Sequence, residues 1–313
     1  DPTNQTLMQR DAYMMGRNLY LGSPADLHRI NDFNYDQNQD RGPVNALALA
    51  YSGLPLIYPD IVGGTFGEHH FNADVTPRMK VYMMRNAQWA SLHSAMGMGQ
   101  PPWSFGDPRV SKVMLESAQL HERLHAYLYS QAVRWFHDGY PWTMAPLPLA
   151  YPRDKNVYGR ENEKVRGYEW MIGDALLATP LYGNDYERAN SRDVYLPDGR
   201  WMDYDTGKLY DGNRFLRDFF LPPGKTPLFV GGTGVIIEGE SSGLQCRLFP
   251  VTNRSSTEFW DRDGRTVSRI HLNVRNWEHI RVVNLRTKLP VKVAWNRNAF
   301  QFMLQPGEDY EVA

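Results

Sequence analysis

The chain has 313 residues, with 34 Lys and Arg against 35 Asp and Glu, so its formal net charge is −1 at pH 7. Its 42% hydrophobic and 22% charged residues are typical of a folded protein and exclude a disordered or collagen-like chain. The balanced charge gives no reason to expect a nucleic-acid partner, and no apolar stretch approaches the roughly 18 residues of a membrane span. The single cysteine, Cys246, excludes an internal disulfide framework and a cysteine-built metal site.

The first half of the chain alternates helical periodicity with short apolar runs. Residues 46–51 predict a helix, and residues 54–58 follow it as a short buried strand. Asp107 and Pro108 predict the N-cap and first turn of a long amphipathic helix that ends at Gly139. Strands that alternate with helices indicate an α/β fold with a parallel sheet.

Beyond about residue 170 the pattern changes to short strands and turns. Residues 193–197 and 200–204 predict two strands around an Asp-Gly turn. Further strands are expected at regular spacing over residues 228–230, 235–237, 271–274 and 280–283. Two small all-β domains are the simplest interpretation of this half.

A polar segment at residues 29–42 has the most unusual local composition. Five of its Asp and Asn side chains fall at every second position: Asp32, Asn34, Asp36, Asn38 and Asp40. A calcium loop built on these oxygens is one interpretation, but Gln37 stands where an EF-hand needs glycine and Pro43 where it needs glutamate. A polar surface loop and an active-site loop for a neutral polar substrate are the other two.

A second candidate is Asp60, which follows the apolar run at residues 54–58 after one proline and precedes the glycine pair Gly63 and Gly64. Enzymes built on parallel strands place catalytic and binding groups at the strands' carboxyl ends, and glycines let the backbone turn sharply beside a ligand. The chain has neither a Gly-x-Ser-x-Gly nor a His-Glu-x-x-His motif, which disfavours serine hydrolase and zinc protease chemistry. No cofactor is expected.

Taken in chain order, six segments resemble glycoside hydrolase family 31, the α-glucosidase/α-galactosidase family. They are residues 29–32 (Arg-Ile-Asn-Asp), 53–64 (with Pro-Asp-Ile-Val-Gly-Gly), 82–85, 100–103 (Gln-Pro-Pro-Trp), 172–180 and 193–201. The Pro-Asp-Ile-Val-Gly-Gly and Pro-Pro-Trp forms are most similar to the branch that contains the myogenesis-regulating glycosidase.

The resemblance implies an α/β fold, with the later part of a (β/α)8 TIM barrel over residues 1–168. Two small all-β sandwich domains would follow it, a proximal one over residues 169–241 and a distal one over residues 242–313. It further implies a retaining α-glycosidase that hydrolyses terminal α-linked sugars, an α-galactoside or an α-glucoside, so the expected partner is an oligosaccharide or glycoside substrate.

The family's motifs also imply roles for four residues. Asp32 would be the general acid/base, Arg29 would bind the sugar and position its loop, and Asp60 would accept hydrogen bonds from sugar hydroxyls. Trp103 would form part of an apolar platform under the sugar. Retaining hydrolysis needs a second carboxylate about 5–5.5 Å from the first, which attacks the anomeric carbon.

Two departures from the family pattern accompany the resemblance. The nucleophile is expected before residue 1, so the N-terminal part of the same enzyme is expected as a partner, and Asp36 and Asp40 are weaker nominees on the acid's own loop. Residues 96–100 lack the family's Arg-x-His pair, so glucose specificity does not follow. A non-catalytic carbohydrate-binding relative and a calcium-stabilised structural domain remain as alternatives, and the compartment stays open.

Overall fold

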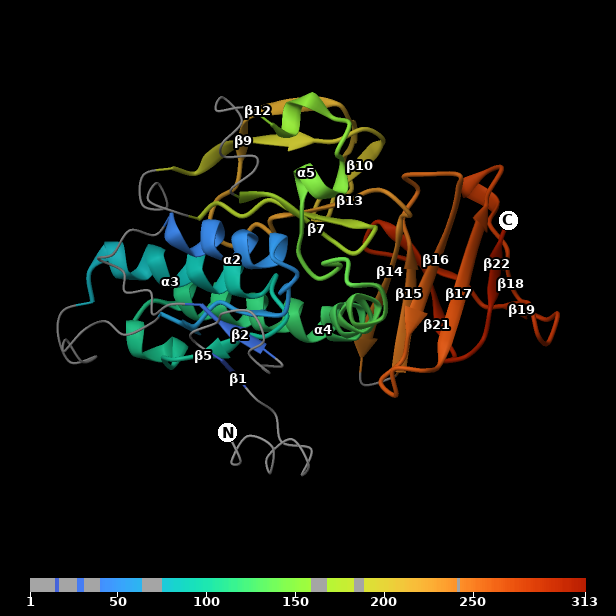
Figure 1. Ribbon diagram of the computed structural model, residues 1–313, viewed down its shortest axis with the longest axis horizontal. Helices are drawn as coiled ribbons and strands as arrows, with labels where there is room; N and C mark the ends of the chain where they lie inside the picture. The colour runs from blue at the N-terminus through green and yellow to red at the C-terminus, as the bar shows by residue number, and fades with distance from the viewer. Residues whose placement is uncertain are drawn as a thin grey trace.

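The computed structural model describes residues 15–16, 27–30, 40–63, 75–158, 168–182, 189–240 and 243–313. Three regions follow one another along the chain (Figure 1): an N-terminal region of helices and short strands, a middle β region, and a C-terminal pair of sheets. No helix in these described ranges combines the length and hydrophobicity needed to cross a lipid bilayer.

The N-terminal region contains short parallel strands. A three-stranded sheet has the order β1 (Met15–Gly16), β2 (Leu27–Arg29), β3 (Ile57–Tyr58), and all its pairs are parallel. A separate parallel pair joins β4 (Ile61–Val62) to β5 (Gly97–Met98). A barrel requires its strands to pair in a closed ring. The strands of the described residues do not close, so the predicted barrel portion is not confirmed.

Three helices accompany these strands: α2 (Arg41–Tyr51), α3 (Pro77–Ala90) and α4 (Pro108–Asp138). The Asp107 side chain accepts from the Arg109 N–H at 3.0 Å and caps α4, which ends at Gly139 with a φ of 76°. The predicted helix is therefore confirmed, with its apolar stripe buried: Val113, Leu120, Leu124 and Leu128. Figure 1 shows α4 running towards the C-terminal sheets, where it contacts β14 and β16.

The middle region consists of a six-stranded sheet and a two-stranded one. The large sheet has the order β11 (Leu209–Asp211), β10 (Arg200–Asp203), β13 (Leu228–Val230), β8 (Leu176–Ala178), β7 (Trp170–Ile172), β6 (Ala145–Pro146). In the small one, β12 (Arg214–Phe220) pairs with β9 (Ser191–Leu196). Both predicted strands around the Asp-Gly turn form, as β9 and β10, but they enter different sheets. Short helical segments connect the elements: η1 (Pro102–Phe105), α5 (Leu147–Ala150) and η2 (Lys155–Val157).

The C-terminal region is a sandwich of two sheets. One has the order β14 (Val235–Glu240), β15 (Gly243–Leu248), β21 (Ala299–Leu304), β20 (Ala294–Asn296). The other has the order β16 (Arg254–Trp260), β17 (Val267–Asn273), β22 (Tyr310–Val312), β18 (Val282–Asn284), β19 (Pro290–Val291), with η3 (Trp277–His279) after β17.

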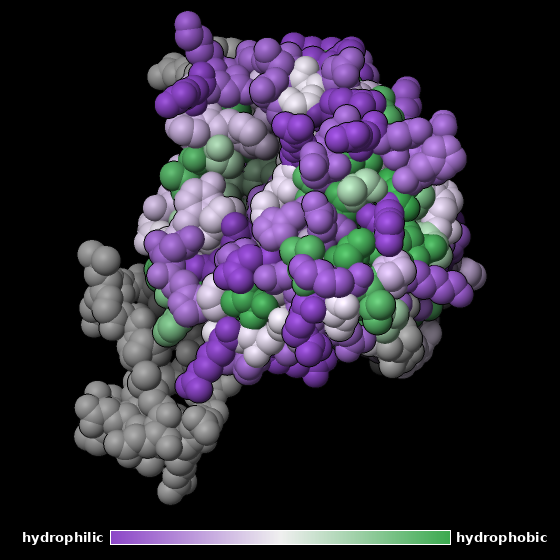
Figure 2. Space-filling view, turned by 90° about the vertical axis from the view of Figure 1, so that its right-hand side faces the viewer, coloured by the Kyte–Doolittle hydropathy of each residue, from purple (hydrophilic) through white to green (hydrophobic). Residues whose placement is uncertain are grey.

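The inner faces of the two sheets share one apolar core. It includes Cys246, Phe259, Phe302 and Tyr310, all buried. Figure 2 shows this end of the molecule, where hydrophobic residues gather between hydrophilic ones. The predicted all-β sandwich character of the second half is thus confirmed, whereas the domain boundaries at residues 168 and 241 stay predictions.

Candidate active site

The structure brings together two of the predicted site residues, Arg29 and Asp60. Arg29 is the last residue of β2, where it aligns with Tyr58, and Asp60 follows β3 by two residues. The Arg29 Nε donates to Asp60 Oδ1 at 2.8 Å, and Nη2 donates to the same oxygen. Asp60 is only 3% exposed. A buried carboxylate requires such a partner, so the pair forms a fixed polar group at the carboxyl ends of parallel strands.

The backbone at Asp60 adopts a φ of 94°, which is rare for a residue with a side chain. Gly63 follows with a φ of 97°, and its N–H donates to Asn86 Oδ1 on α3 at 2.9 Å. Asn86 Nδ2 in turn donates to the Tyr182 hydroxyl at 3.0 Å. The Tyr182 ring stacks on Trp89 with 4.6 Å between ring centroids. The turn that carries Asp60 is therefore held by α3 and by a segment more than 100 residues further along the chain.

Strand β5 approaches this turn so closely that two positions beside it must be glycine. A Cβ atom on Gly97 would lie 2.5 Å from the Tyr58 hydroxyl oxygen, and one on Gly99 would lie 2.7 Å from the Ile61 side chain. Gly99 also donates its N–H to Val62 O at 3.2 Å. The stretch without the family's Arg-x-His pair is thus the one where the backbone packs directly against the Asp60 turn.

Burial and charge shift two titratable groups here. Burial raises the pKa of Tyr58, the Asp60 carboxylate raises it further, and the Arg29 guanidinium opposes both. Burial also lowers the pKa of His28, which precedes Arg29 on β2. Both shifts favour the neutral form of these two side chains near pH 7.

The roles predicted for the other site residues stay predictions. Asp32 lies outside the described residues, as do Asn34, Asp36 and Asn38, so the catalytic and calcium roles assigned to that segment stay predictions. Within the described ranges, no group of three or more His, Cys, Asp or Glu residues could hold a metal ion. Trp103 lies on η1 with 78% of its surface exposed. Its role as a sugar platform is therefore also still a prediction.

Sequence reasoning missed Asn86, Tyr182 and Tyr168. The Tyr168 hydroxyl donates to Asp40 Oδ1, which ties the start of α2 to the strand region after residue 168. Asn86 lies inside a helix, and nothing in the sequence around it indicates that its side-chain amide forms hydrogen bonds with distant loops. Only the pairing of segments that are remote in sequence identifies these residues.

We expect Asn86→Ala to lower the free energy of unfolding by about 1–3 kcal/mol, because it removes the acceptor of the buried Gly63 N–H and the hydrogen bond to the Tyr182 hydroxyl. Urea denaturation measures this loss. The matched control is Ser104→Ala, which removes an exposed hydroxyl that donates at 2.7 Å to Pro101 O. Equal stability of the two variants would mean that Asn86 does not hold the turn.

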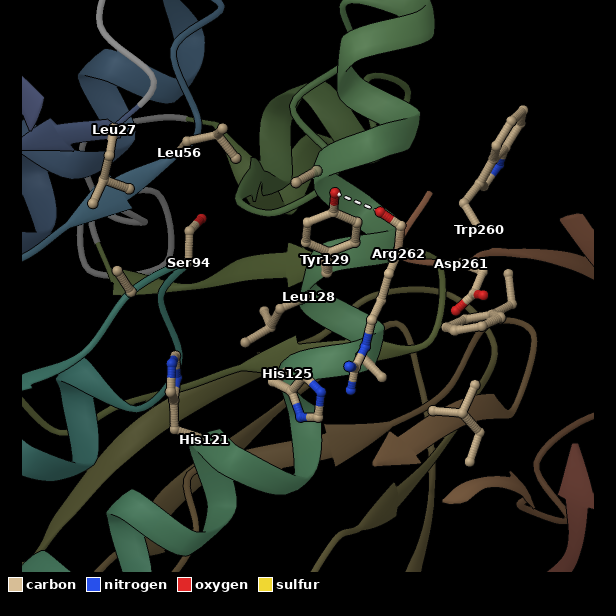
Figure 3. A pocket seen from close by; sticks show the side chains of 15 residues that line it. Leu27, Leu56, Ser94, His121, His125, Leu128, Tyr129, Trp260, Asp261 and Arg262 are labelled. Carbon is tan, nitrogen blue, oxygen red and sulfur yellow. Dashed lines mark hydrogen bonds between the residues drawn. The ribbon is translucent and has the colours of Figure 1, made fainter. Parts of the chain in front are cut away.

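A separate cavity of about 490 Å³ lies at the other end of the same strands. Leu27 begins β2 and Leu56 precedes β3, and both line the cavity opposite α4 (Figure 3). His121, His125 and Tyr129 reach it from α4, and Tyr129 donates its hydroxyl to Arg262 O at 3.1 Å. Since catalytic groups of parallel-strand enzymes lie at the carboxyl ends, this mainly apolar cavity is not the candidate active site.

Comparisons with known proteins show which families, sequences and structures the chain is similar to. Residues 139–237 match the glycosyl hydrolase family 31 C-terminal domain. The chain is 30% identical over 184 residues to a 1,6-alpha-glucosyltransferase of Sporosarcina globispora, covering 55% of this chain and 14% of that protein. It is 29% identical over 171 residues to the myogenesis-regulating glycosidase of Mus musculus, covering 53% and 22%. The Flavobacterium johnsoniae GH31 dextranase complexed with isomaltotriose superposes with a TM-score of 0.74 at 18% identity, over 97% of this chain and 46% of that one.

These relatives define a class of carbohydrate-active proteins, which act as glycosidases or glycosyltransferases. Within that class, the chain is similar to the C-terminal portion of glycosyl hydrolase family 31 members, and its residues 139–237 match the C-terminal domain of that family. It spans less than a third of the length of the curated relatives named here.

Proposed function

We propose that the whole protein is a retaining α-glycosidase that removes terminal α-linked sugars, an α-galactoside or an α-glucoside. The observation that carries the proposal is the buried Arg29–Asp60 pair at the carboxyl ends of β2 and β3. A fixed carboxylate accepts strongly from neutral hydroxyl groups, which are the only hydrogen-bond donors of an unmodified sugar. The two hydrogen bonds from Arg29 hold the Asp60 carboxylate in a fixed position.

Asp32 is the proposed general acid/base. It follows Arg29 by three positions in the sequence, in the Arg-Ile-Asn-Asp segment that resembles the family's motif. In retaining hydrolysis it donates a proton to the leaving oxygen while a second carboxylate, proposed to lie upstream of residue 1, attacks the anomeric carbon. Asp32 then removes a proton from the incoming water, which releases the sugar from the nucleophile.

Glycosyl transfer is the second candidate, because the chain is 30% identical to a 1,6-alpha-glucosyltransferase and 27% identical to an isomaltosyltransferase. The first half of the reaction is then the same, and a sugar hydroxyl replaces water in the second half. Product analysis with a large excess of acceptor sugar separates the two: hydrolysis gives free monosaccharide, and transfer gives a longer oligosaccharide.

We expect Asp60→Ala in the whole protein to raise KM for its best substrate by tenfold or more and to leave far-UV circular dichroism and oligomeric state unchanged. The loss of a charged hydrogen bond to the sugar, worth about 1.5–3 kcal/mol, is the reason. Nitrophenyl α-galactoside, α-glucoside and α-xyloside are the substrates to compare. The control is Asp193→Ala, which removes an exposed carboxylate paired with Arg217. A protein that melts, or a KM equal to that of the control, would contradict the binding role.

A further inference from the structure

Three aromatic rings form a corner at one end of the C-terminal sandwich, which we call the aromatic corner: Trp277, Trp295 and Phe300. The Phe300 ring lies between the other two. It is nearly parallel to Trp277, with 6.0 Å between centroids and 23° between planes, and it meets Trp295 edge-on at 4.7 Å and 73°. Trp295 is 57% exposed, on the edge strand β20. The corner therefore offers an open indole beside two partly covered rings.

The core of the sandwich does not account for Trp295. Trp277 and Phe300 pack against the buried cluster between the two sheets, whereas Trp295 is not among the side chains that do so. Exposing an indole to water has a free-energy cost that a smaller residue on this edge strand would avoid. Trp295 can thus be replaced with little effect on folding, which makes it suitable for testing a binding role.

The backbone that carries Trp295 is held rigidly. The hairpin from β20 to β21 turns at Arg297 and Asn298, whose φ values are 45° and 66°, as a two-residue turn between paired strands requires. Arg247 Nη2 donates to Arg297 O at 2.6 Å, and Asn298 Nδ2 donates to Asp205 O at 3.2 Å. A ring fixed in this way loses little conformational entropy when a ligand binds.

The hydrogen-bond partner of Trp277 is an uncharged amide. Trp277 Nε1 donates to Asn253 Oδ1 at 3.0 Å. Asn253 is exposed, and its Nδ2 group, with two N–H donors, makes no hydrogen bond among the described residues. Apolar ring faces beside a free amide suit a ligand with both C–H faces and hydroxyl groups.

We propose that the aromatic corner is a saccharide-binding site, separate from the candidate active site, for a neutral α-linked oligosaccharide or polysaccharide. The C–H face of one pyranose ring packs on the Trp295 indole, and the Asn253 amide, which lies beyond Phe300 and Trp277, donates to a hydroxyl of another sugar unit of the same oligosaccharide. The site would hold a polymeric carbohydrate on the protein without taking part in bond cleavage. Only the choice of α-linked probes rests on the proposed function.

Affinity electrophoresis of the whole protein in native gels tests the proposal, with soluble dextran, soluble starch or galactomannan in the gel. We expect at least one of these polysaccharides to retard the protein, and Trp295→Ala to weaken the apparent affinity about tenfold or more, as the loss of one aromatic contact predicts. Trp295→Tyr should retain part of the retardation. Phe220→Ala, which removes a 61% exposed ring from β12, is the matched control and should migrate as the parent does.

Three results would overturn the proposal. They are an unretarded parent protein with all three polysaccharides, equal retardation of the parent and Trp295→Ala, and equal losses in Trp295→Ala and Phe220→Ala, which would indicate general hydrophobic adsorption. Light scattering adds a fourth: a change of oligomeric state in Trp295→Ala would mean that the corner binds a second copy of the chain. Asp60→Ala should still be retarded, so the active-site proposal and this one fail independently.

Discussion

Replacing Asp32 with asparagine in the whole protein should lower kcat on an unactivated α-glycoside by about 10²–10⁴-fold, the usual contribution of a general acid. The amide is nearly isosteric but cannot donate the proton that the leaving oxygen needs. A nitrophenyl glycoside should suffer a much smaller loss in its first step, because nitrophenolate leaves without protonation. Comparing kcat for the two substrate types therefore measures acid catalysis separately from binding.

Asp36→Asn is the matched control, since it makes the same chemical change on the same segment four residues away. We expect it to keep most of the activity. Unchanged turnover of Asp32→Asn on the unactivated glycoside would refute the assignment. An equal loss in both variants would instead point to the polar segment as a structural or calcium-binding unit, and a chelator should then lower the melting temperature of the unmodified protein.

The sequence predicted those elements whose ends carry local signals. The long helix α4 is an example, because Asp107 caps its start, Pro108 occupies its first turn, and Gly139 supplies the left-handed residue that ends it. Sheet partners carry no such signal. The strands β9 and β10 are separated by a tight turn, and yet they pair with β12 and with β11 and β13 respectively. The partner of a strand depends on packing between remote segments, which local patterns do not encode.

The same difference between local and remote signals separates the predicted from the missed residues of the candidate site. Arg29 and Asp60 could be named from motifs, and the parallel pairing of β2 and β3 explains why they meet. Asn86 and Tyr182 could not, because their roles come from a hydrogen bond between residues 96 positions apart. The aromatic corner was missed for a related reason: Trp277 lies on η3 and Trp295 on β20, and only the fold shows that Phe300 contacts both rings.

The interior of the middle region contains an ion pair that couples stability to pH. Glu169 is fully buried and accepts from Arg192 Nη2 at 2.7 Å and from the Tyr195 N–H at 3.2 Å. Burial raises the pKa of Glu169 to about 8, although the Arg192 guanidinium opposes the rise. A folded-state pKa above the unfolded value of about 4.3 means that the contribution of Glu169 to stability is full below pH 4.3 and is lost as the pH rises through 8.

Replacing Arg192 with methionine should therefore destabilise the protein by an amount that grows with pH. At pH 6, where Glu169 is mostly protonated, the cost is the loss of hydrogen bonds to Pro180 O at 2.9 Å and Asp193 O at 3.1 Å, about 1–3 kcal/mol. Above pH 8 the unmodified protein ionises Glu169 beside its cation. The variant cannot do this without burying an unpaired charge, so the deficit grows by about 1.4 kcal/mol per pH unit.

Urea denaturation of both proteins at pH 6 and pH 9 measures the difference, which we expect to reach about 3–5 kcal/mol at pH 9. Arg217→Met is the matched control. It breaks the exposed pair with Asp193, which solvent screens, so its cost should stay below about 1 kcal/mol at both pH values. A deficit in Arg192→Met that is the same at pH 6 and pH 9 would show that Glu169 does not titrate against this guanidinium. The pair would then act only through packing and hydrogen bonds to the backbone.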